Sequence, residues 1–247
     1  MLFSILGDSI STYENVNPSG YSVFYTVENC RRNHMVSVCD TWWYQVILYF
    51  HGQLAVNGSY SGSMVSGRNF PAANSDVRIQ DLSLSGRYLP DIILIYLGVN
   101  DFGNGVLLKG KPLADKFWET EYKDRKLEYF DFAYKEMIRK MKRNYPGAQI
   151  FCGTLMRTFI FGNDNWLFPE NFNGKVAFEK YNDSIRKICS AQKIVCLDLS
   201  EGNVRYETLD GTHPTKAGHQ MLAHNWINRL GYYLPNSQVK EQNLCRL

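Results

Sequence analysis

The sequence predicts an α/β protein built on one mostly parallel sheet. Five short apolar segments read as strands, and amphipathic helical patterns separate them along the 247-residue chain. Strands that alternate with helices form a mostly parallel sheet with helices on both of its faces. The length suits one large domain, so we expect residues 1–247 to form a single unit.

The predicted strands are apolar runs that stop at turn residues. A short run of this kind is typical of a buried strand. The five strands are Leu2–Leu6, Gln53–Val56, Ile92–Leu97, Ala148–Gly153 and Ile194–Leu197.

The predicted helices fill the intervals between these strands. The first begins at a plausible cap, Asp40, and the third ends at Tyr145-Pro146-Gly147. The helices cover Asp40–Phe50, Asp76–Leu84, Lys126–Asn144, Lys175–Gln192 and Thr215–Leu230. We expect the last helix to pack its apolar side chains Ala217, Met221, Leu222, Trp226 and Leu230.

Two long segments, Phe102–Arg125 and Met156–Gly174, do not fit this alternation and are expected to be loops. Each follows a predicted strand, so each should lie at the end of the sheet where ligands bind. Loops of this length are usually functional or mobile. The polar tail from Asn236 onward is expected to be loosely ordered.

Composition and charge exclude several classes of protein. Hydrophobic residues make up 45% and charged residues 21% of the chain, which is typical of a globular protein. A net charge of +3 is too small to indicate a nucleic-acid or membrane partner. No signal peptide is apparent and no apolar run could span a bilayer, so we expect a cytoplasmic protein whose cysteines are reduced and mostly structural. These are Cys30, Cys39, Cys152, Cys189, Cys196 and Cys245.

The first candidate for chemistry is Ser9. It lies in a glycine-led turn, Gly7-Asp8-Ser9, directly after the first predicted strand. A serine at the carboxyl end of such a strand can be a nucleophile if a histidine base and an oxyanion hole lie nearby. Taken alone, the tripeptide is more typical of an ordinary turn than of a nucleophile.

A base and its partner occur near the C-terminus, in Asp210-Gly211-Thr212-His213-Pro214. The spacing lets the Asp210 carboxylate reach the Nδ1–H of His213 while Nε2 points outward. Pro214 fixes the entry into the last helix. By itself Asp-x-x-His is a common turn and helix cap.

Two further turns offer donors for an oxyanion. Asn57–Ser63 follows the second strand, and its Gly62 allows a close approach of backbone to substrate. Gly98-Val99-Asn100-Asp101 follows the third strand and carries the Asn100 carboxamide, a neutral donor. Each is individually a plain turn, but all of these turns would converge on one crevice.

In these four blocks, taken in order, the chain resembles the SGNH (GDSL-type) hydrolase superfamily. Gly7-Asp8-Ser9-Ile10 resembles the nucleophile block, with Ile10 where leucine is usual. Asn57–Gly62 resembles the block that supplies the oxyanion glycine. Gly98–Asp101 resembles the Gly-x-Asn-Asp block, and Asp210–His213 resembles the terminal Asp-His dyad.

The resemblance implies a role for each residue and a particular fold. Ser9 would be the nucleophile, His213 the base and Asp210 the residue that orients it. The backbone amides of Ser9 and Gly62 and the side chain of Asn100 would form the oxyanion hole. The fold would be a flavodoxin-like three-layer α/β/α sandwich with about five parallel strands.

Other candidates carry two readings. An aromatic loop with Tyr13, Tyr21, Phe24 and Tyr25, together with Phe159 and Trp166, could form an acyl- or sugar-binding wall or a satellite hydrophobic cluster. Trp42 and Trp43 are expected to pack a helix on the sheet, although one ring could border the crevice. His219 and His224 are expected on a solvated helix face, and no metal-ligand spacing appears, so we expect neither a metal nor a cofactor.

The function expected from these observations is that of a metal-independent serine esterase with an acyl-enzyme intermediate. Its substrate would be a small-molecule or carbohydrate ester, with short acyl groups such as acetyl favoured. The alternatives are a lysophospholipase or thioesterase with the same catalytic residues, and a catalytically silent carbohydrate-binding module.

Overall fold

A five-stranded parallel sheet lies at the centre of the structure, a computed structural model that describes residues 1–108, 126–171 and 176–234. Its strands are β1 (Leu2–Gly7), β2 (Gln53–Asn57), β3 (Ile92–Tyr96), β4 (Gln149–Gly153) and β6 (Val195–Leu197). They are arranged in the order β2-β1-β3-β4-β6, and each neighbouring pair is parallel. The five predicted strands and the parallel sheet are confirmed.

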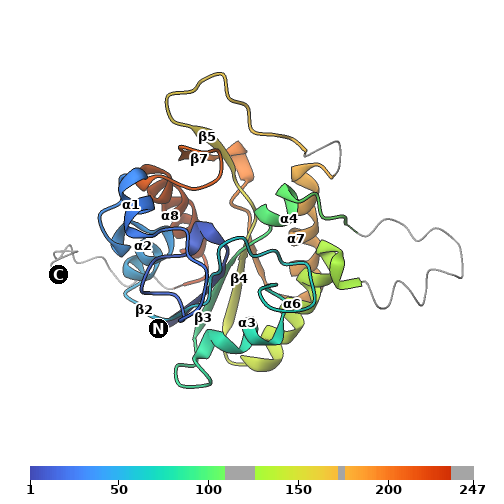
Figure 1. The fold of residues 1–247 in the computed structure, drawn as a ribbon. Helices are drawn as coiled ribbons and strands as arrows, with labels where there is room; N and C mark the ends of the chain where they lie inside the picture. The colour runs from blue at the N-terminus through green and yellow to red at the C-terminus, as the bar shows by residue number, and fades with distance from the viewer. Residues whose placement is uncertain (109–125, 172–175, 235–247) are drawn as a thin grey trace, which may run out of the picture.

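Helices cover both faces of this sheet, which confirms the three-layer fold (Figure 1). On one side α2 packs against α8, and on the other side α6 packs against α7, with α3 beside α6. The helices are α1 (Val27–Arg32), α2 (Trp42–Tyr49), α3 (Asp76–Gln80), α4 (Val99–Gly103), α6 (Phe130–Asn144), α7 (Phe178–Gln192) and α8 (Lys216–Leu230).

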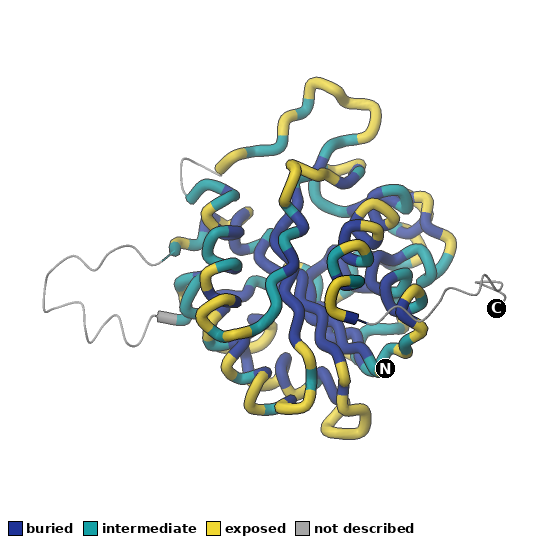
Figure 2. Tube along the Cα trace, turned by 180° about the vertical axis from the view of Figure 1, so that it is seen from behind, coloured by how far each residue is buried: buried dark blue, intermediate teal, exposed yellow. Residues whose placement is uncertain are grey.

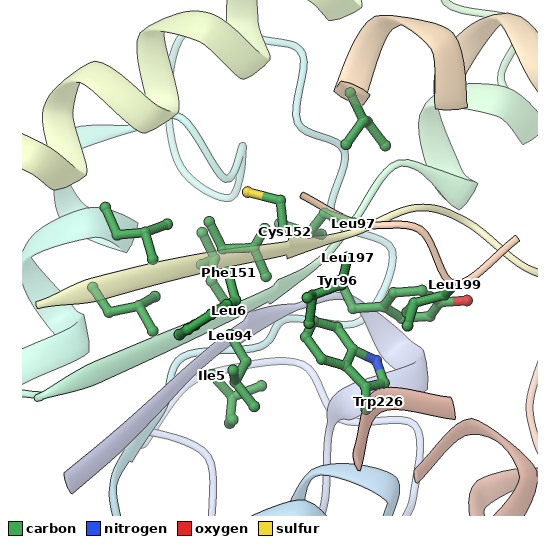
Figure 3. Close-up of a cluster of buried hydrophobic side chains, with 14 of the residues drawn as sticks. Ile5, Leu6, Leu94, Tyr96, Leu97, Phe151, Cys152, Leu197, Leu199 and Trp226 are labelled. Carbon is green, nitrogen blue, oxygen red and sulfur yellow. The ribbon is translucent and has the colours of Figure 1, made fainter. Parts of the chain in front are cut away.

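The core lies between the sheet and the two helical layers. Figure 2 shows the buried trace concentrated in the central strands and the inner sides of the helices. Figure 3 shows buried side chains of the central strands, among them Leu94 and Phe151, with Trp226 of α8 at one edge of the cluster. Trp226 stacks on Trp42 of α2 with ring centroids 5.0 Å apart. Trp42 and Trp43 are both fully buried, so they pack helix against sheet and neither borders a crevice.

Three predictions about residues in or beside the helices were wrong, those for Asp40, Met221 and His219. The helix predicted from Asp40 begins at Trp42, because the Asp40 carboxylate accepts hydrogen bonds from the backbone of Val36 and Ser37 and ends a preceding 3₁₀ turn. Met221 of α8 is exposed, because it lies on the outer side of that helix. His219 is fully buried where α8 meets α2, and its Nδ1 accepts a hydrogen bond from the backbone of Trp42.

A second, two-stranded sheet was not predicted. β5 (Arg157–Ile160) pairs in parallel with β7 (Arg205–Thr208), so the start of the segment 156–174 is a strand and not a loop. The paired residues of β5 and β7 lie 48 positions apart in the sequence, so no local sequence pattern indicates the pairing. Residues 109–125, 172–175 and 235–247 lie outside the described residues, and with them most of the predicted loop 102–125 and the predicted tail.

Two features of the described residues concern membranes and thiols. None of their helices is both long and apolar enough to cross a membrane. The cysteines among them are free: Cys30, Cys152 and Cys189 are buried, and Cys39 and Cys196 are half-buried.

Candidate active site

The order of the strands fixes where a site can form. β1 and β3 are neighbours, with Gly7 level with Tyr96, but the chain continues from β1 to the outer strand β2. This is a topological switch point, where the loops after two adjacent strands diverge and leave room for a ligand. Ser9 follows β1 and Asn100 follows β3 at this edge.

The turn that carries Ser9 is held by the residue before it. Oδ1 of Asp8 accepts a hydrogen bond of 3.0 Å from the backbone of Ile10, and the Thr12 hydroxyl donates to the carbonyl of Ser9 at 3.0 Å. Asp8 is fully buried, and burial, together with the nearby carboxylate of Asp101, raises its pKa to about 7. Ser9 is therefore fixed at the carboxyl end of β1 by groups that share its turn.

Ser9, His213 and Asp210 form one hydrogen-bonded chain. His213 Nε2 lies 2.9 Å from Ser9 Oγ, and His213 Nδ1 lies 2.7 Å from Asp210 Oδ2. Oδ1 of Asp210 accepts the backbone N–H groups of Thr212 and His213, which closes the turn. The turn requires Gly211, whose φ of +86° is in the left-handed region.

The charge on Asp210 is set by these bonds. Burial alone would raise the pKa of this carboxyl, but the hydrogen bonds from His213 and from the backbone outweigh it and lower the pKa to about 2. Asp210 is therefore ionised at neutral pH and accepts the Nδ1 proton of His213. This leaves Nε2 as an acceptor for the Ser9 hydroxyl, which is the arrangement that removes a proton from a serine.

The turns after β2 and β3 are tied to each other. Asn100 Nδ2 donates to the carbonyl of Ser63 at 3.1 Å. The buried Asp101 carboxylate accepts the backbone N–H groups of Val65 and Ser66 at 2.8 and 2.9 Å, while burial raises its pKa to about 6. Gly62 has a φ of +78° with open space in front of its Cα, so a group can approach its backbone closely.

Arg78, a residue that was not predicted, supports the turns around the site. Its guanidinium is fully buried and donates to the carbonyls of Gly7, Gly58 and Pro71 and to the hydroxyl of Ser63. Burial lowers its pKa to about 10, so it stays charged at neutral pH. Arg78 thus joins the end of β1 to the turn after β2; a lone arginine in a short helix gives no signal of this.

The candidate substrate-binding aromatics occupy different places. The Trp166 ring lies against the turn Asp210–Pro214, because a Cβ on Gly211 would meet it at 2.8 Å. Phe159 is a half-buried residue of β5, with its carbonyl bonded to the hydroxyl of Thr208. Tyr13 packs on a small cluster of Tyr25, Cys30 and Met35. This is the satellite hydrophobic cluster that the sequence offered as the alternative to a substrate-binding wall.

Ring contacts to His213 were also missed. Phe24, from the segment before α1, stacks on the His213 imidazole, and Tyr25 donates from its hydroxyl to the carbonyl of Pro214. The predicted aromatic loop therefore contacts the turn Asp210–Pro214 directly. Tyr21 lies elsewhere, in edge-to-face contact with Tyr60 and Phe70.

The parallel sheet carries a serine, a histidine and an aspartate that are hydrogen-bonded to one another at its switch point. These features define a class: flavodoxin-like folds with the Ser-His-Asp arrangement of serine hydrolases. Residues 1–157 match the model of the family described as GDSL-like Lipase/Acylhydrolase. The chain belongs to this family.

Two curated relatives share part of the sequence. A multidomain esterase of Ruminococcus flavefaciens is 27% identical over 161 residues, which are 63% of this chain and 17% of the relative. The cellulase/esterase CelE of Acetivibrio thermocellus is 27% identical over 150 residues, 59% of this chain and 15% of the relative. The chain therefore spans about a sixth of the length of the curated relatives it matches.

Solved structures resemble nearly the whole chain. A GDSL-like lipase from Bacteroides uniformis is 27% identical, with a TM-score of 0.67 over 94% of this chain and 95% of that one. A GDSL-like lipase from Bacteroides ovatus is 26% identical, with a TM-score of 0.63 over 91% and 95%. A family two carbohydrate esterase from Clostridium thermocellum, in complex with cellohexaose, is 22% identical with a TM-score of 0.52 over 94% and 64%, which shows the shared fold alone.

Proposed function

We propose that this protein is a serine esterase that hydrolyses carboxylic esters through an acyl-enzyme intermediate without a metal. The observation that carries the proposal is the hydrogen-bonded chain from Ser9 Oγ through His213 to Asp210. A binding module has no use for an acceptor nitrogen at a serine hydroxyl, whereas acyl transfer requires it.

The reaction would proceed in two steps with the same groups. Ser9 Oγ attacks the ester carbonyl while its proton passes to His213 Nε2, and His213 then protonates the leaving alcohol. Water, activated by His213, releases the acid from Ser9. Asp210 remains ionised and stabilises the imidazolium formed in each step.

The oxyanion would be bound by neutral donors from three turns. Amide nitrogens of Ser9 and Gly62 and the side chain of Asn100 are proposed to supply them. The carboxamide of Asn100 has two N–H hydrogens, and Ser63 accepts one, which fixes the plane of the group. The second is then free to donate to an oxygen that becomes negative in the transition state.

Acetyl or other short acyl esters on carbohydrate are the proposed substrates. The support is that the curated relatives are named as esterases, one of them also as a cellulase, and that a solved neighbour is a carbohydrate esterase bound to cellohexaose. An aromatic ring, Trp166, also borders the turn Asp210–Pro214, the proposed catalytic turn, where it could face a sugar. Phe159 on β5 and Tyr13, which packs on the cluster of Tyr25, Cys30 and Met35, are proposed as further substrate contacts.

The proposal is tested by comparing esters with one purified protein. Hydrolysis of p-nitrophenyl acetate, butyrate and octanoate and of acetylated xylo- and manno-oligosaccharides is measured with and without EDTA. We expect the acetate and the acetylated sugars to be favoured, with rates unchanged by EDTA and lost in Ser9→Ala. Preference for octanoate, for a lysophospholipid or for an acyl thioester would instead support the alternatives with the same residues. Sugar binding without any turnover would leave the silent module.

A further inference from the structure

The imidazole of His213 lies face to face with the ring of Phe24. The two ring centroids are 3.4 Å apart and the ring planes are only 6° from parallel. Phe24 belongs to neither the nucleophile turn nor the turn that carries His213. The contact is therefore an addition to the hydrogen bonds that link Ser9, His213 and Asp210.

We propose that Phe24 is a positioning residue for His213. It would hold the plane of the imidazole and stabilise the imidazolium that forms when His213 accepts the Ser9 proton. This inference rests on the proposed function, because only a histidine that acts as a base becomes charged in the reaction.

The stack between Phe24 and His213 is face to face. Two neutral aromatic rings prefer offset or edge-to-face packing to a direct face-to-face stack. A cation over the face of a phenyl ring, in contrast, is attracted by the negative face of that ring at centroid distances up to about 6 Å. The contact at 3.4 Å therefore becomes stronger as His213 is protonated, and interactions that strengthen on the way to the transition state raise kcat.

The backbone of Phe24 is anchored to the nucleophile turn. Its N–H donates to the Thr12 hydroxyl at 2.9 Å, and that hydroxyl donates to the carbonyl of Ser9 at 3.0 Å. The carbonyl of Phe24 accepts a hydrogen bond of 2.7 Å from the side chain of Asn29. A closed ring of contacts thus runs through Ser9, Thr12, Phe24 and His213. It fixes the position of the base relative to that of the nucleophile.

The neighbouring residue, Tyr25, holds the other end of the same unit. It is fully buried, and its hydroxyl donates to the carbonyl of Pro214 at 2.8 Å. Two adjacent aromatic residues therefore hold two adjacent residues of the catalytic turn. The titratable groups that act on this imidazole include Asp210, on the same turn, and the buried His219 of α8, whose pKa is lowered to about 3 by burial and which is neutral at pH 7.

The stack itself is tested without activity, in the Ser9→Ala protein. The face of a phenyl ring shields protons above it, so the His213 ring protons should resonate upfield in proton NMR, assigned by their loss in His213→Gln. Adding Phe24→Leu should move them downfield, whereas Phe24→Tyr should leave them in place. Resonances that do not move in Phe24→Leu would overturn the stack.

The role in catalysis is tested in the active protein with the same substitutions. We expect Phe24→Leu to lower kcat about threefold to tenfold with KM within twofold, and Phe24→Tyr to retain kcat within twofold, because it keeps the aromatic face. Tyr49→Leu removes an aromatic contact at the far end of α2 and should leave kcat unchanged. If Phe24→Leu fails to fold, Phe24→Met fills a similar volume without a ring and replaces it.

The results separate this inference from the proposed function. Unchanged kcat in Phe24→Leu, an equal loss in Phe24→Tyr, or a change in KM alone would each overturn the positioning role. Full activity in Ser9→Ala would instead overturn the proposed function, while the NMR comparison would still decide whether the rings stack.

Discussion

Ser9 Oγ lies 2.9 Å from His213 Nε2, although 204 positions of sequence separate the two residues. The contact forms because β1 delivers Ser9 to the carboxyl edge of the sheet and β7 leads into the turn that carries His213. The first prediction concerns these two residues.

Ser9→Ala and His213→Ala should each abolish most turnover of an activated ester. The double variant should be scarcely slower than either single one, because the two side chains catalyse one step together. Steady-state rates of the three variants measure this, with thermal unfolding as a check on folding. Losses that multiply in the double variant would mean that the residues act independently.

Asn100→Ala should lower kcat by about 10²–10³-fold with KM little changed, because an oxyanion donor acts mainly in the transition state. Asn104→Ala is the matched control: Asn104 directly follows the same short helix, but its side chain donates to the carbonyl of Asn100, away from the turn after β2. Near-normal kcat with a lowered Tm in Asn100→Ala would show that Asn100 has a structural role only, through its hydrogen bond to the carbonyl of Ser63.

Trp166→Ala should change KM for acetylated oligosaccharides while p-nitrophenyl acetate is still cleaved, because the Trp166 ring borders the catalytic turn at Gly211, and a small activated ester does not need a sugar-binding ring. Leu167→Ala, at the exposed neighbouring residue, is the control. It should change neither the KM for acetylated oligosaccharides nor the cleavage of p-nitrophenyl acetate. Phe159→Ala should have a weaker effect on KM. Loss of folding in Trp166→Ala would assign the ring to the structure of the loop.

Asp8→Asn should stabilise the protein increasingly as pH rises from 4 to 7. The folded pKa of Asp8 is about 7 and the ordinary value is 3.8, so in this window the unfolded chain is ionised while the folded protein holds a proton. Folding then binds a proton, and stability falls with rising pH. The free energy of unfolding of Asp8→Asn relative to the parent should therefore increase by on the order of 4 kcal/mol between pH 4 and pH 7.

Urea unfolding of both proteins at several pH values measures this difference. Taking the difference removes the contribution of His219, whose lowered pKa acts in the opposite direction over the same range. The Asp101 carboxyl acts on Asp8, so its contribution cancels only in part. Asp210 has a lowered pKa, and its contribution is lost only as pH falls from about 4 towards 2. A difference that is constant from pH 4 to pH 8 would show that Asp8 is ionised in the folded protein.

Arg78→Met should cost at least about 3 kcal/mol of stability, because it removes the guanidinium donors from the buried carbonyls of Gly7 and Gly58 and from the hydroxyl of Ser63. Arg87→Met, at an exposed position, is the control and should be within about 0.5 kcal/mol of the parent. Chemical unfolding of both variants gives the comparison. A small effect of Arg78→Met would mean that water reaches these carbonyls.

The sequence by itself determined the layers of the fold and the edge at which the candidate residues meet. Strands such as Ile92–Tyr96 and helices such as Phe130–Asn144 are specified by apolar periodicity over a few neighbouring residues, which is present in the sequence. Parallel strands end at one edge, so Ser9 and Asn100 could be placed together before any contact was known. The Asp210–His213 contact was also predictable, because three residues on one turn fix its reach.

The tertiary structure alone decided the contacts between segments that are distant along the chain. The pairing of β5 with β7, the burial of His219 under α2, the bonds of Arg78 and the stack of Phe24 on His213 have no periodicity that marks them. Each depends on which side chains face each other after the layers have packed. A single arginine, histidine or phenylalanine looks the same in a sequence whether it meets water or a partner, and only the packed fold supplies that partner.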